Sequence, residues 1–213
     1  MIRAMTETDV VSRLGEERCV AILRTSHAAG AAPAMEAALR GGFRLVEFTL
    51  GTPGALDLAA AFAARGDCLV GVGTVLTEAE ARAAVAAGAS FLVSPVVDEA
   101  VMAVARSLDV PMIPGCQTPT ELLRAYRAGA PVQKVFPAAP PAQLGSNLGP
   151  LPFLRLLPTS GVDAGNAAAY LRAGCFAVGF VSSLFVEEEI AAGRWDRIEA
   201  RARRLLAAVR DAR

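Results

Sequence analysis

Short apolar runs alternate with alanine-rich helical stretches along this chain, and one pattern recurs about every 45 residues. In each copy a glycine ends an amphipathic helical stretch, and a β-type run follows directly. The four copies are LRGGFRLVEFTL, VAAGASFLVSP, YRAGAPVQKVFP and LRAGCFAVGFV. The recurrence predicts a fold built from repeated helix and strand units.

Four further strand candidates lie between these copies: Cys19–Arg24, Leu69–Val75, Pro111–Cys116 and Phe153–Thr159. Nearly every run is continuously apolar instead of alternating, which is typical of parallel strands covered on both faces. The pattern therefore predicts eight parallel strands with helices packed against them.

Helical periodicity fills most of the intervals between the strands. The predicted helices are Thr8–Leu14, Ala32–Arg40, Ala55–Arg65, Glu78–Ala87, Asp98–Ser107, Thr120–Ala128, Ala164–Ala173 and Trp195–Arg210. Regular alternation without a long structureless insert favours an α/β fold of one domain, residues 1–213, forming a small (β/α)8 TIM barrel in place of a doubly wound sheet. The first helix precedes the first strand, and we expect it to cap the bottom of the barrel.

The interval after the sixth strand breaks this rhythm. The segment PAAPPAQLGSNLGPLP has four prolines before Leu151 and little helical periodicity. Since proline disrupts a helix interior, we expect the sixth helix to be short or absent.

Composition narrows the class of protein. The chain is 54% hydrophobic over 213 residues, but its apolar runs never reach the roughly 20 residues of a membrane span. The segment Met1–Gly15 contains acidic residues and has no apolar core of a signal peptide, so we expect a cytoplasmic protein without a membrane partner. Basic and acidic residues number 21 each, without a basic run, and nucleic acid is therefore not an expected partner.

The sequence also has no usual signature of a metal site. Its four cysteines are widely spaced without a CxxC pair, and the only histidine is His27. We expect no metal.

Lys134 is the only lysine, and it lies inside the apolar run PVQKVFP. An arginine stays charged in essentially any environment, whereas a desolvated lysine can lose its proton and condense with a ketone or aldehyde. The position therefore suggests a Schiff-base lysine. A lysine that snorkels to solvent, or one that pairs with a carboxylate, stays open as an alternative.

Glu47 stands in the apolar run LVEFTL, where an unpaired carboxylate is costly to bury. It needs either a cationic partner or a role in proton transfer. In a TIM barrel the chemistry gathers at the carboxyl ends of the strands, so Glu47 and Lys134 could face each other there. Polar or constrained residues follow the other strands at Arg24, Thr74, Pro95, Cys116, Thr159 and Gly179.

Seven short motifs occur in order: AILR, VEFTLGT, GVGTVL, LVSP, PGCQTPTE, QKVFPA and PTSG. Together they resemble the 2-keto-3-deoxy-6-phosphogluconate aldolase and 4-hydroxy-2-oxoglutarate aldolase family, from about Val20 to the final helix. The resemblance implies a class I aldolase without a cofactor, whose substrates are pyruvate and an aldehyde, and a homotrimer.

The resemblance also implies roles for the site residues. Lys134 forms the Schiff base, and Glu47 is the general acid and base, acting through water. Thr74 and an arginine hold the pyruvate carboxylate. Three further residues line the pocket: Pro95, Phe136 and Thr159.

Two departures from the family pattern affect these roles. Many members carry an arginine where this chain has Gly51, but others place one at the end of strand one, so the carboxylate role is carried to Arg24. The substrate-binding set is completed by Ser160, Gly161, Gly179 and Ser182.

At the phosphate end, members typically read PTGG and Gly-Ser, whereas this chain has Ser160-Gly161 and Val181-Ser182. Because the branched Val181 narrows the approach to the backbone, we expect an unphosphorylated or differently shaped aldol while the pyruvate half is retained.

Two other interpretations remain open. A phosphate-handling barrel, such as an epimerase or a thiamine-phosphate synthase, shares such strand-ending turns, although fold analogy alone carries little weight. The second interpretation is a non-catalytic barrel that binds a keto acid or a partner protein.

Overall fold

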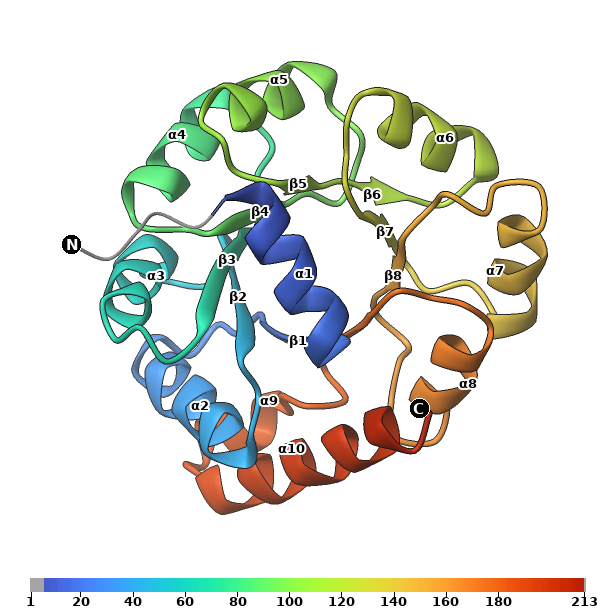
Figure 1. Cartoon of the computed structure of the whole chain (residues 1–213). Coiled ribbons are helices and arrows are strands. Elements are labelled where there is room, and N and C mark those ends of the chain that lie inside the picture. The colour runs from blue at the N-terminus through green and yellow to red at the C-terminus, as the bar shows by residue number, and fades with distance from the viewer. Residues whose placement is uncertain (1–5, 213) are drawn as a thin grey trace.

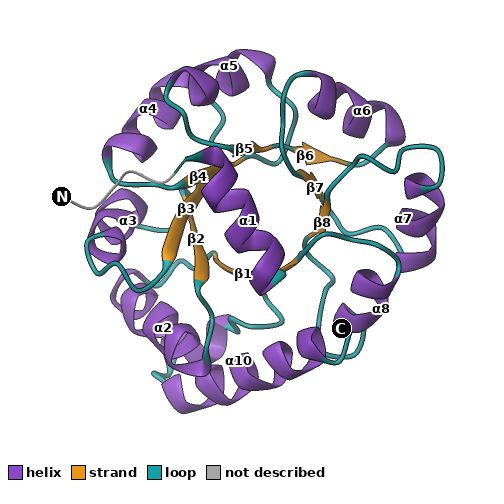
Figure 2. Cartoon of the chain, in the orientation of Figure 1, coloured by secondary structure: helices purple, strands orange, loops and turns teal. Residues whose placement is uncertain are grey.

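The computed structural model describes residues 6–212, which form a ring of parallel strands inside a ring of helices (Figure 2). The strands are β1 (Cys19–Leu23), β2 (Leu45–Thr49), β3 (Leu69–Gly73), β4 (Phe91–Val93), β5 (Met112–Ile113), β6 (Gly115–Cys116), β7 (Gln133–Val135), β8 (Leu156–Pro158) and β9 (Val178–Phe180). They pair in the order β5-β4-β3-β2-β1-β9 and β6-β7-β8.

Two contacts close these two sheets into one barrel. Strands β5 and β6 are the two halves of the predicted fifth strand, and between them the Pro114 carbonyl accepts a hydrogen bond of 3.0 Å from the Lys134 amide. A parallel bridge between Thr159 and Gly179 joins β8 to β9. The predicted (β/α)8 barrel is thus confirmed, with its fifth strand interrupted at a proline that has no amide hydrogen to donate.

The helices follow the predicted alternation. They are α1 (Glu7–Glu17), α2 (Ala28–Gly41), α3 (Ala55–Ala63), α4 (Glu78–Ala86), α5 (Glu99–Ser107), α6 (Pro119–Arg127), α7 (Pro141–Leu148), α8 (Ala167–Arg172), α9 (Glu187–Ala191) and α10 (Trp195–Arg210). The short helix α9 was not predicted. In the four repeated units the glycine after each helix has a positive φ, between 89° and 116°, which explains the recurring residue.

The segment predicted as a short or absent sixth helix holds α7, which has eight residues against nine in α6. The prediction of an absent helix is wrong because the prolines gather at its start: Pro140 is the N-cap and Pro141 lies in the first turn, where no amide hydrogen is required. Strand β8 begins at Leu156, later than the predicted start at Phe153. The exposed Phe153 ring packs against Tyr126, with 4.5 Å between the ring centroids.

Each strand separates two apolar layers. In β1, Cys19, Ala21 and Leu23 belong to the layer between strands and helices, whereas Val20 and Ile22 belong to the layer inside the barrel. Both faces are buried, and this explains why the strands read as continuous apolar runs.

Helix α1 lies across the amino-terminal end of the barrel (Figure 1). Its Val10 and Leu14 side chains join the inner apolar layer. Gly15 lies directly over Phe176, because a Cβ atom at this position would come within 2.9 Å of the ring. The prediction of a helix that caps the bottom of the barrel is confirmed.

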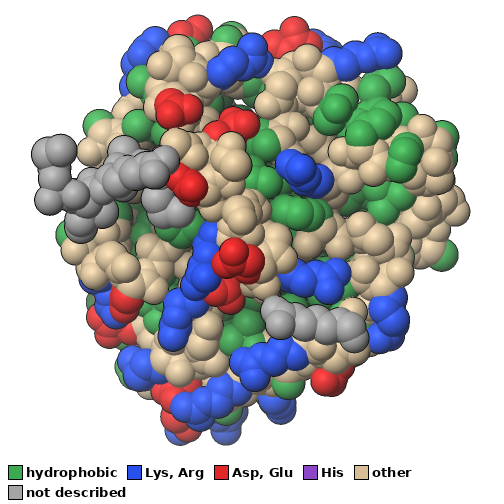
Figure 3. Space-filling view, in the orientation of Figure 1, with side chains coloured by type: hydrophobic (Ala, Val, Ile, Leu, Met, Phe, Trp, Pro, Cys, Tyr) green, Lys and Arg blue, Asp and Glu red, His purple; other side chains and the backbone are tan. Residues whose placement is uncertain are grey.

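Acidic and basic side chains are interspersed over the face that carries α1 (Figure 3). Among residues 6–212, no helix is both long and apolar enough to cross a membrane.

Candidate active site

Lys134 occupies the middle of β7, between Gly115 of β6 and Leu157 of β8 in register. Only 6% of the residue is exposed. The Nζ atom lies 5.0 Å from the centroid of the Phe136 ring, which covers the amine from the carboxyl end of the same strand. The structure therefore does not support a lysine that snorkels into bulk solvent.

Glu47 lies in the middle of β2 and is 2% exposed. Its carboxylate lies over Gly73 of the neighbouring strand, where an added Cβ atom would be 1.9 Å from Oε1. Any larger residue at position 73 would displace the carboxylate. Oε1 has no hydrogen-bond partner within residues 6–212, so this oxygen is free to accept a proton or a polar ligand.

Lys134 and Glu47 influence each other without forming a direct ion pair within the described part of the chain. Burial lowers the pKa of the Lys134 amine from 10.5, the Glu47 charge opposes this shift, and Arg24 adds to it. Burial raises the pKa of the Glu47 carboxyl from 4.5, against the opposing charges of Lys134 and Arg24. Both shifts favour neutral forms, which gives a nucleophilic amine beside a group able to donate a proton.

Arg24 follows β1 at the same end of the barrel, and its side chain is exposed. It is the cation that acts on both buried groups. The space around Gly51 is open, since a Cβ atom there would meet nothing within 4 Å. The charge of Arg24 thus reaches both buried groups, and position 51 offers no side chain there.

Thr159 and Gly179 form a close pair where β8 meets β9. Thr159 is buried, and a Cβ atom on Gly179 would lie 2.5 Å from its hydroxyl oxygen. Because position 179 is a glycine, the Thr159 side chain can fill the space that a Cβ atom would otherwise occupy. Both predicted residues are brought together at the carboxyl end of the barrel.

Three other predicted residues lie in turns with unusual backbone geometry. Thr74 and Ser160 have φ values of 63° and 68°, in the left-handed region that is costly for a non-glycine residue, and Gly161 has 90°. All three follow strands β3 and β8 at the same end as Lys134. Thr74 is β-branched, so its positive φ costs conformational energy. Such strained residues gather at functional sites, which makes this turn a candidate part of the site.

Pro95 and Ser182 also follow strands at this end. The Pro95 carbonyl oxygen lies over Gly115, 2.2 Å from where a Cβ atom would be. Ser182 is exposed, and its neighbour Val181 packs against the inner apolar layer. Both Pro95 and Ser182 follow strands at the end of the barrel where the proposed substrate site lies.

Sequence reasoning missed a set of hydroxyl and carboxylate groups beside Arg24. Thr49 and Thr52 at the end of β2 contact each other, Thr52 contacts the loop after β1, and Glu187 at the start of α9 binds the same loop. Thr49 and Thr52 follow an apolar strand, which is a weak sequence signal of a functional site. Glu187 is 162 positions from Thr25, and no sequence pattern indicated that the two residues would be in contact.

Cys116 is not a competing nucleophile. Burial raises the pKa of its thiol to about 12, with a smaller contribution from Glu121, so the thiol stays protonated at neutral pH.

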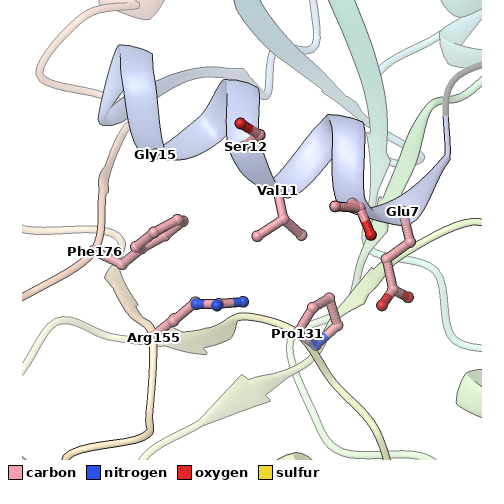
Figure 4. A pocket seen from close by; sticks show the side chains of 8 residues that line it. Glu7, Val11, Ser12, Gly15, Pro131, Arg155 and Phe176 are labelled. Carbon is pink, nitrogen blue, oxygen red and sulfur yellow. The ribbon is translucent and has the colours of Figure 1, made fainter.

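A cavity of about 480 Å³ lies at the opposite end of the barrel, beside α1 (Figure 4). Its lining includes Pro131, Arg155 and Phe176, which precede strands β7, β8 and β9. It is therefore separate from the carboxyl ends of the strands, where Lys134 and Glu47 lie.

Comparisons with known proteins show the family of this chain. A family model described as KDPG and KHG aldolase matches residues 10–201. The 2-dehydro-3-deoxy-phosphogluconate aldolase of Treponema pallidum is 33% identical over 90% of this chain and 93% of its own length. The KHG/KDPG aldolase of Escherichia coli is 33% identical over 81% of this chain and 83% of its own.

A solved structure shows the same fold. The KDPG aldolase of Legionella pneumophila, with pyruvate captured as a covalent carbinolamine, superposes with a TM-score of 0.82 and 28% identity. The match covers 94% of this chain and 98% of the other.

Proposed function

Because this chain belongs to the KDPG and KHG aldolase family and is a carbon–carbon lyase, we propose that Lys134 is its Schiff-base residue and Glu47 its general acid and base. The observation that carries these roles is the buried pair itself: an amine with a lowered pKa and a carboxyl with a raised pKa, each buried in the middle of its strand and each acted on by the other's charge. Pyruvate and an aldehyde are the proposed products of cleavage.

The steps follow from these two groups. The neutral amine of Lys134 attacks the C2 carbonyl of the aldol, and the neutral Glu47 carboxyl, through water, gives the proton with which the C2 hydroxyl leaves as water, so that an iminium ion and the Glu47 carboxylate remain. Glu47, through a water molecule, takes the proton of the C4 hydroxyl while the C3–C4 bond breaks. The bonding electrons pass to the iminium nitrogen and give an enamine, and the aldehyde leaves.

The second half of the reaction returns the enzyme to its starting state. Protonated Glu47 gives a proton to C3 of the enamine, which forms the pyruvate iminium ion. Water then adds at C2, and pyruvate departs from the free amine of Lys134.

Arg24 and Thr74 are the proposed partners of the pyruvate carboxylate. The Arg24 guanidinium lies close enough to Lys134 to change its pKa, which suits a cation that pairs with a carboxylate one bond away from the reacting carbon. Pro95, Phe136 and Thr159 are the proposed pocket lining, of which Phe136 is seen beside the amine.

Borohydride trapping tests the role of Lys134. Incubation with pyruvate and reduction should add one reduced pyruvyl group, found by mass spectrometry on the peptide that contains Lys134. Lys134→Arg keeps a charge but cannot form the imine, and it should show no adduct. An adduct on another residue, or none in the wild type, would contradict the assignment. Binding of pyruvate in calorimetry without an adduct would favour the non-catalytic alternative.

For the far end of the substrate we propose an unphosphorylated or differently shaped aldol, with Ser160, Gly161, Gly179 and Ser182 around it. Support comes from Val181, whose side chain packs into the barrel where family members typically have glycine. A short or absent sixth helix, as expected from the sequence, would remove part of this rim and favour the same conclusion, but α7 is present, so this argument gives no support. Cleavage rates of phosphorylated and unphosphorylated 2-keto-3-deoxy acids, measured side by side, test it, and a strong preference for the phosphorylated acid would refute it.

A homotrimer in the cytoplasm and one domain over residues 1–213 complete the proposal, on the support of the family resemblance. Light scattering coupled to size exclusion measures the number of subunits, and a monomer would overturn that part.

A further inference from the structure

One carboxylate oxygen of Glu187 holds the loop that follows β1. Oε1 accepts hydrogen bonds from the Thr25 hydroxyl at 3.0 Å, the Ser26 amide at 2.8 Å and the Ser26 hydroxyl at 2.7 Å. Burial opposes ionisation of Glu187, but these hydrogen bonds outweigh it and keep the pKa of its carboxyl below the usual value. The carboxylate is therefore ionised at neutral pH, and its hydrogen bonds are charge-assisted.

The hydroxyl of Thr52 holds the same loop from the other side. It accepts a hydrogen bond of 3.4 Å from the Thr25 amide and donates one of 3.4 Å to the Leu23 carbonyl. The Thr49 hydroxyl lies 3.3 Å away and completes the set as a donor to Thr52. All three threonines are at least 97% buried. These are long hydrogen bonds, but they are protected from water.

Both groups bind the residues on either side of Arg24. Thr52 contacts Leu23 and Thr25, and Glu187 contacts Thr25 and the next residue. The Arg24 side chain itself makes no hydrogen bond or ion pair to any residue in the described range 6–212. The backbone of Arg24 is thus fixed, while its guanidinium is left unpaired at the mouth of the site.

We propose that Glu187 is a positioning residue, which fixes the backbone of Arg24 and thereby sets the affinity of the site for the carboxylate of the keto acid. This inference rests on the proposed role of Arg24 as the carboxylate partner. A guanidinium on an anchored backbone loses less conformational entropy when it binds, so anchoring increases affinity without a contact to the ligand. Glu187 comes from the segment after β9, which pairs directly with β1, so in this proposal the neighbouring strand supplies the group that anchors the Arg24 loop.

The test compares Glu187→Ala, Arg24→Ala and the double variant by the pyruvate concentration that gives half-maximal borohydride trapping. Glu187→Ala should raise this concentration by roughly tenfold, as expected for loss of one charge-assisted hydrogen-bond set, with the same final extent of trapping. In the Arg24→Ala background, Glu187→Ala should have no further effect, because the group that it positions is gone. Glu187→Gln retains an acceptor oxygen and should recover part of the affinity.

Glu188→Ala is the matched control, since Glu188 lies in the same first turn of α9 but is exposed. It should bind pyruvate like the wild type. If Glu187→Ala does not fold, Ser26→Ala removes one of the three hydrogen bonds and should show a smaller shift in the same direction.

Three results would overturn the inference: an unchanged half-maximal concentration in Glu187→Ala, an equal effect of Glu188→Ala, or effects of Glu187→Ala and Arg24→Ala that simply multiply. If Arg24→Ala itself leaves the pyruvate requirement unchanged, the proposed carboxylate role of Arg24 fails instead, and this outcome is distinguishable from the others.

Discussion

Gly73→Ala should stop the chemistry while leaving the fold intact. An added Cβ atom would be 1.9 Å from Oε1 of Glu47, and Cβ contacts under 3.0 Å essentially do not occur. The carboxylate must therefore move by about 1 Å, the scale of misplacement that can cost roughly 100-fold in rate. This corresponds to about 2.7 kcal/mol of transition-state stabilisation. Gly73 has no positive φ, so alanine brings no backbone strain.

The enamine step can be followed without knowing the aldehyde. In D2O, a working site exchanges the methyl protons of pyruvate, and nuclear magnetic resonance measures the rate. Exchange needs a correctly placed proton-transfer group, so Gly73→Ala should slow it by about 100-fold. Borohydride trapping at high pyruvate should still label Lys134, because the amine is retained.

Two glycine variants serve as controls. Gly71→Ala puts a Cβ atom 2.1 Å from the buried Phe91 ring and should lower the melting temperature, because a clash in the packed interior costs about 1 to 3 kcal/mol. Gly51→Ala meets nothing within 4 Å and should change neither property. The reasoning is refuted if folded Gly73→Ala exchanges pyruvate protons at the wild-type rate.

Three further variants probe the charges and the rim. Arg24→Ala should raise the pyruvate requirement by about 2 to 4 kcal/mol, or roughly 30- to 1000-fold. Because Arg24 helps to lower the pKa of Lys134, the acid limb of trapping should also move to higher pH, and an unmoved limb would speak against their coupling. Glu47→Gln should stabilise the fold at pH 8 by about 1 kcal/mol in urea denaturation. Because the pKa of Glu47 is raised in the folded protein, wild-type Glu47 is neutral in both states below pH 4.5 and destabilises the fold only at higher pH. The gain in unfolding free energy from Glu47→Gln should therefore vanish near pH 4. An equal gain at pH 4 and pH 8 would contradict this reasoning. Val181→Gly should shift the ratio of kcat/KM toward the phosphorylated acid by about tenfold, whereas an unchanged ratio would remove Val181 as a determinant.

The barrel could be predicted because its signals are local and repeated. Each helix end that needs a left-handed residue has a glycine, at Gly42, Gly88, Gly129 and Gly174. The runs that follow are buried on both faces and are therefore uniformly apolar. The errors arose where one residue has opposite effects in different positions, as Pro141 does: it disrupts a helix interior and favours a helix start.

The proposed catalytic pair, Lys134 and Glu47, could be selected from the sequence because a lone lysine and a carboxylate are conspicuous in apolar strands, and the structure shows that both are buried. The residues that hold this pair and its loops in place could not be predicted from the sequence. Gly73 reads as an ordinary strand glycine, and only the path of the Glu47 side chain across the strand pair shows its purpose. Glu187 stands in a run of three glutamates, and its contact with Thr25 depends on closure of the whole ring.

Helix α1 and the inner apolar layer close one end of the barrel, and this closure bears on the order in which the two products leave the site. Lys134 is buried, and α1 with the inner apolar layer covers it on the amino-terminal side, so a substrate must approach the amine from the carboxyl ends of the strands. In the proposed mechanism the fragment tethered to the Lys134 amine lies innermost, and the fragment released by bond cleavage lies between it and the outside. The mechanism therefore predicts that the aldehyde leaves first and pyruvate last, and that in synthesis the keto acid enters before its partner.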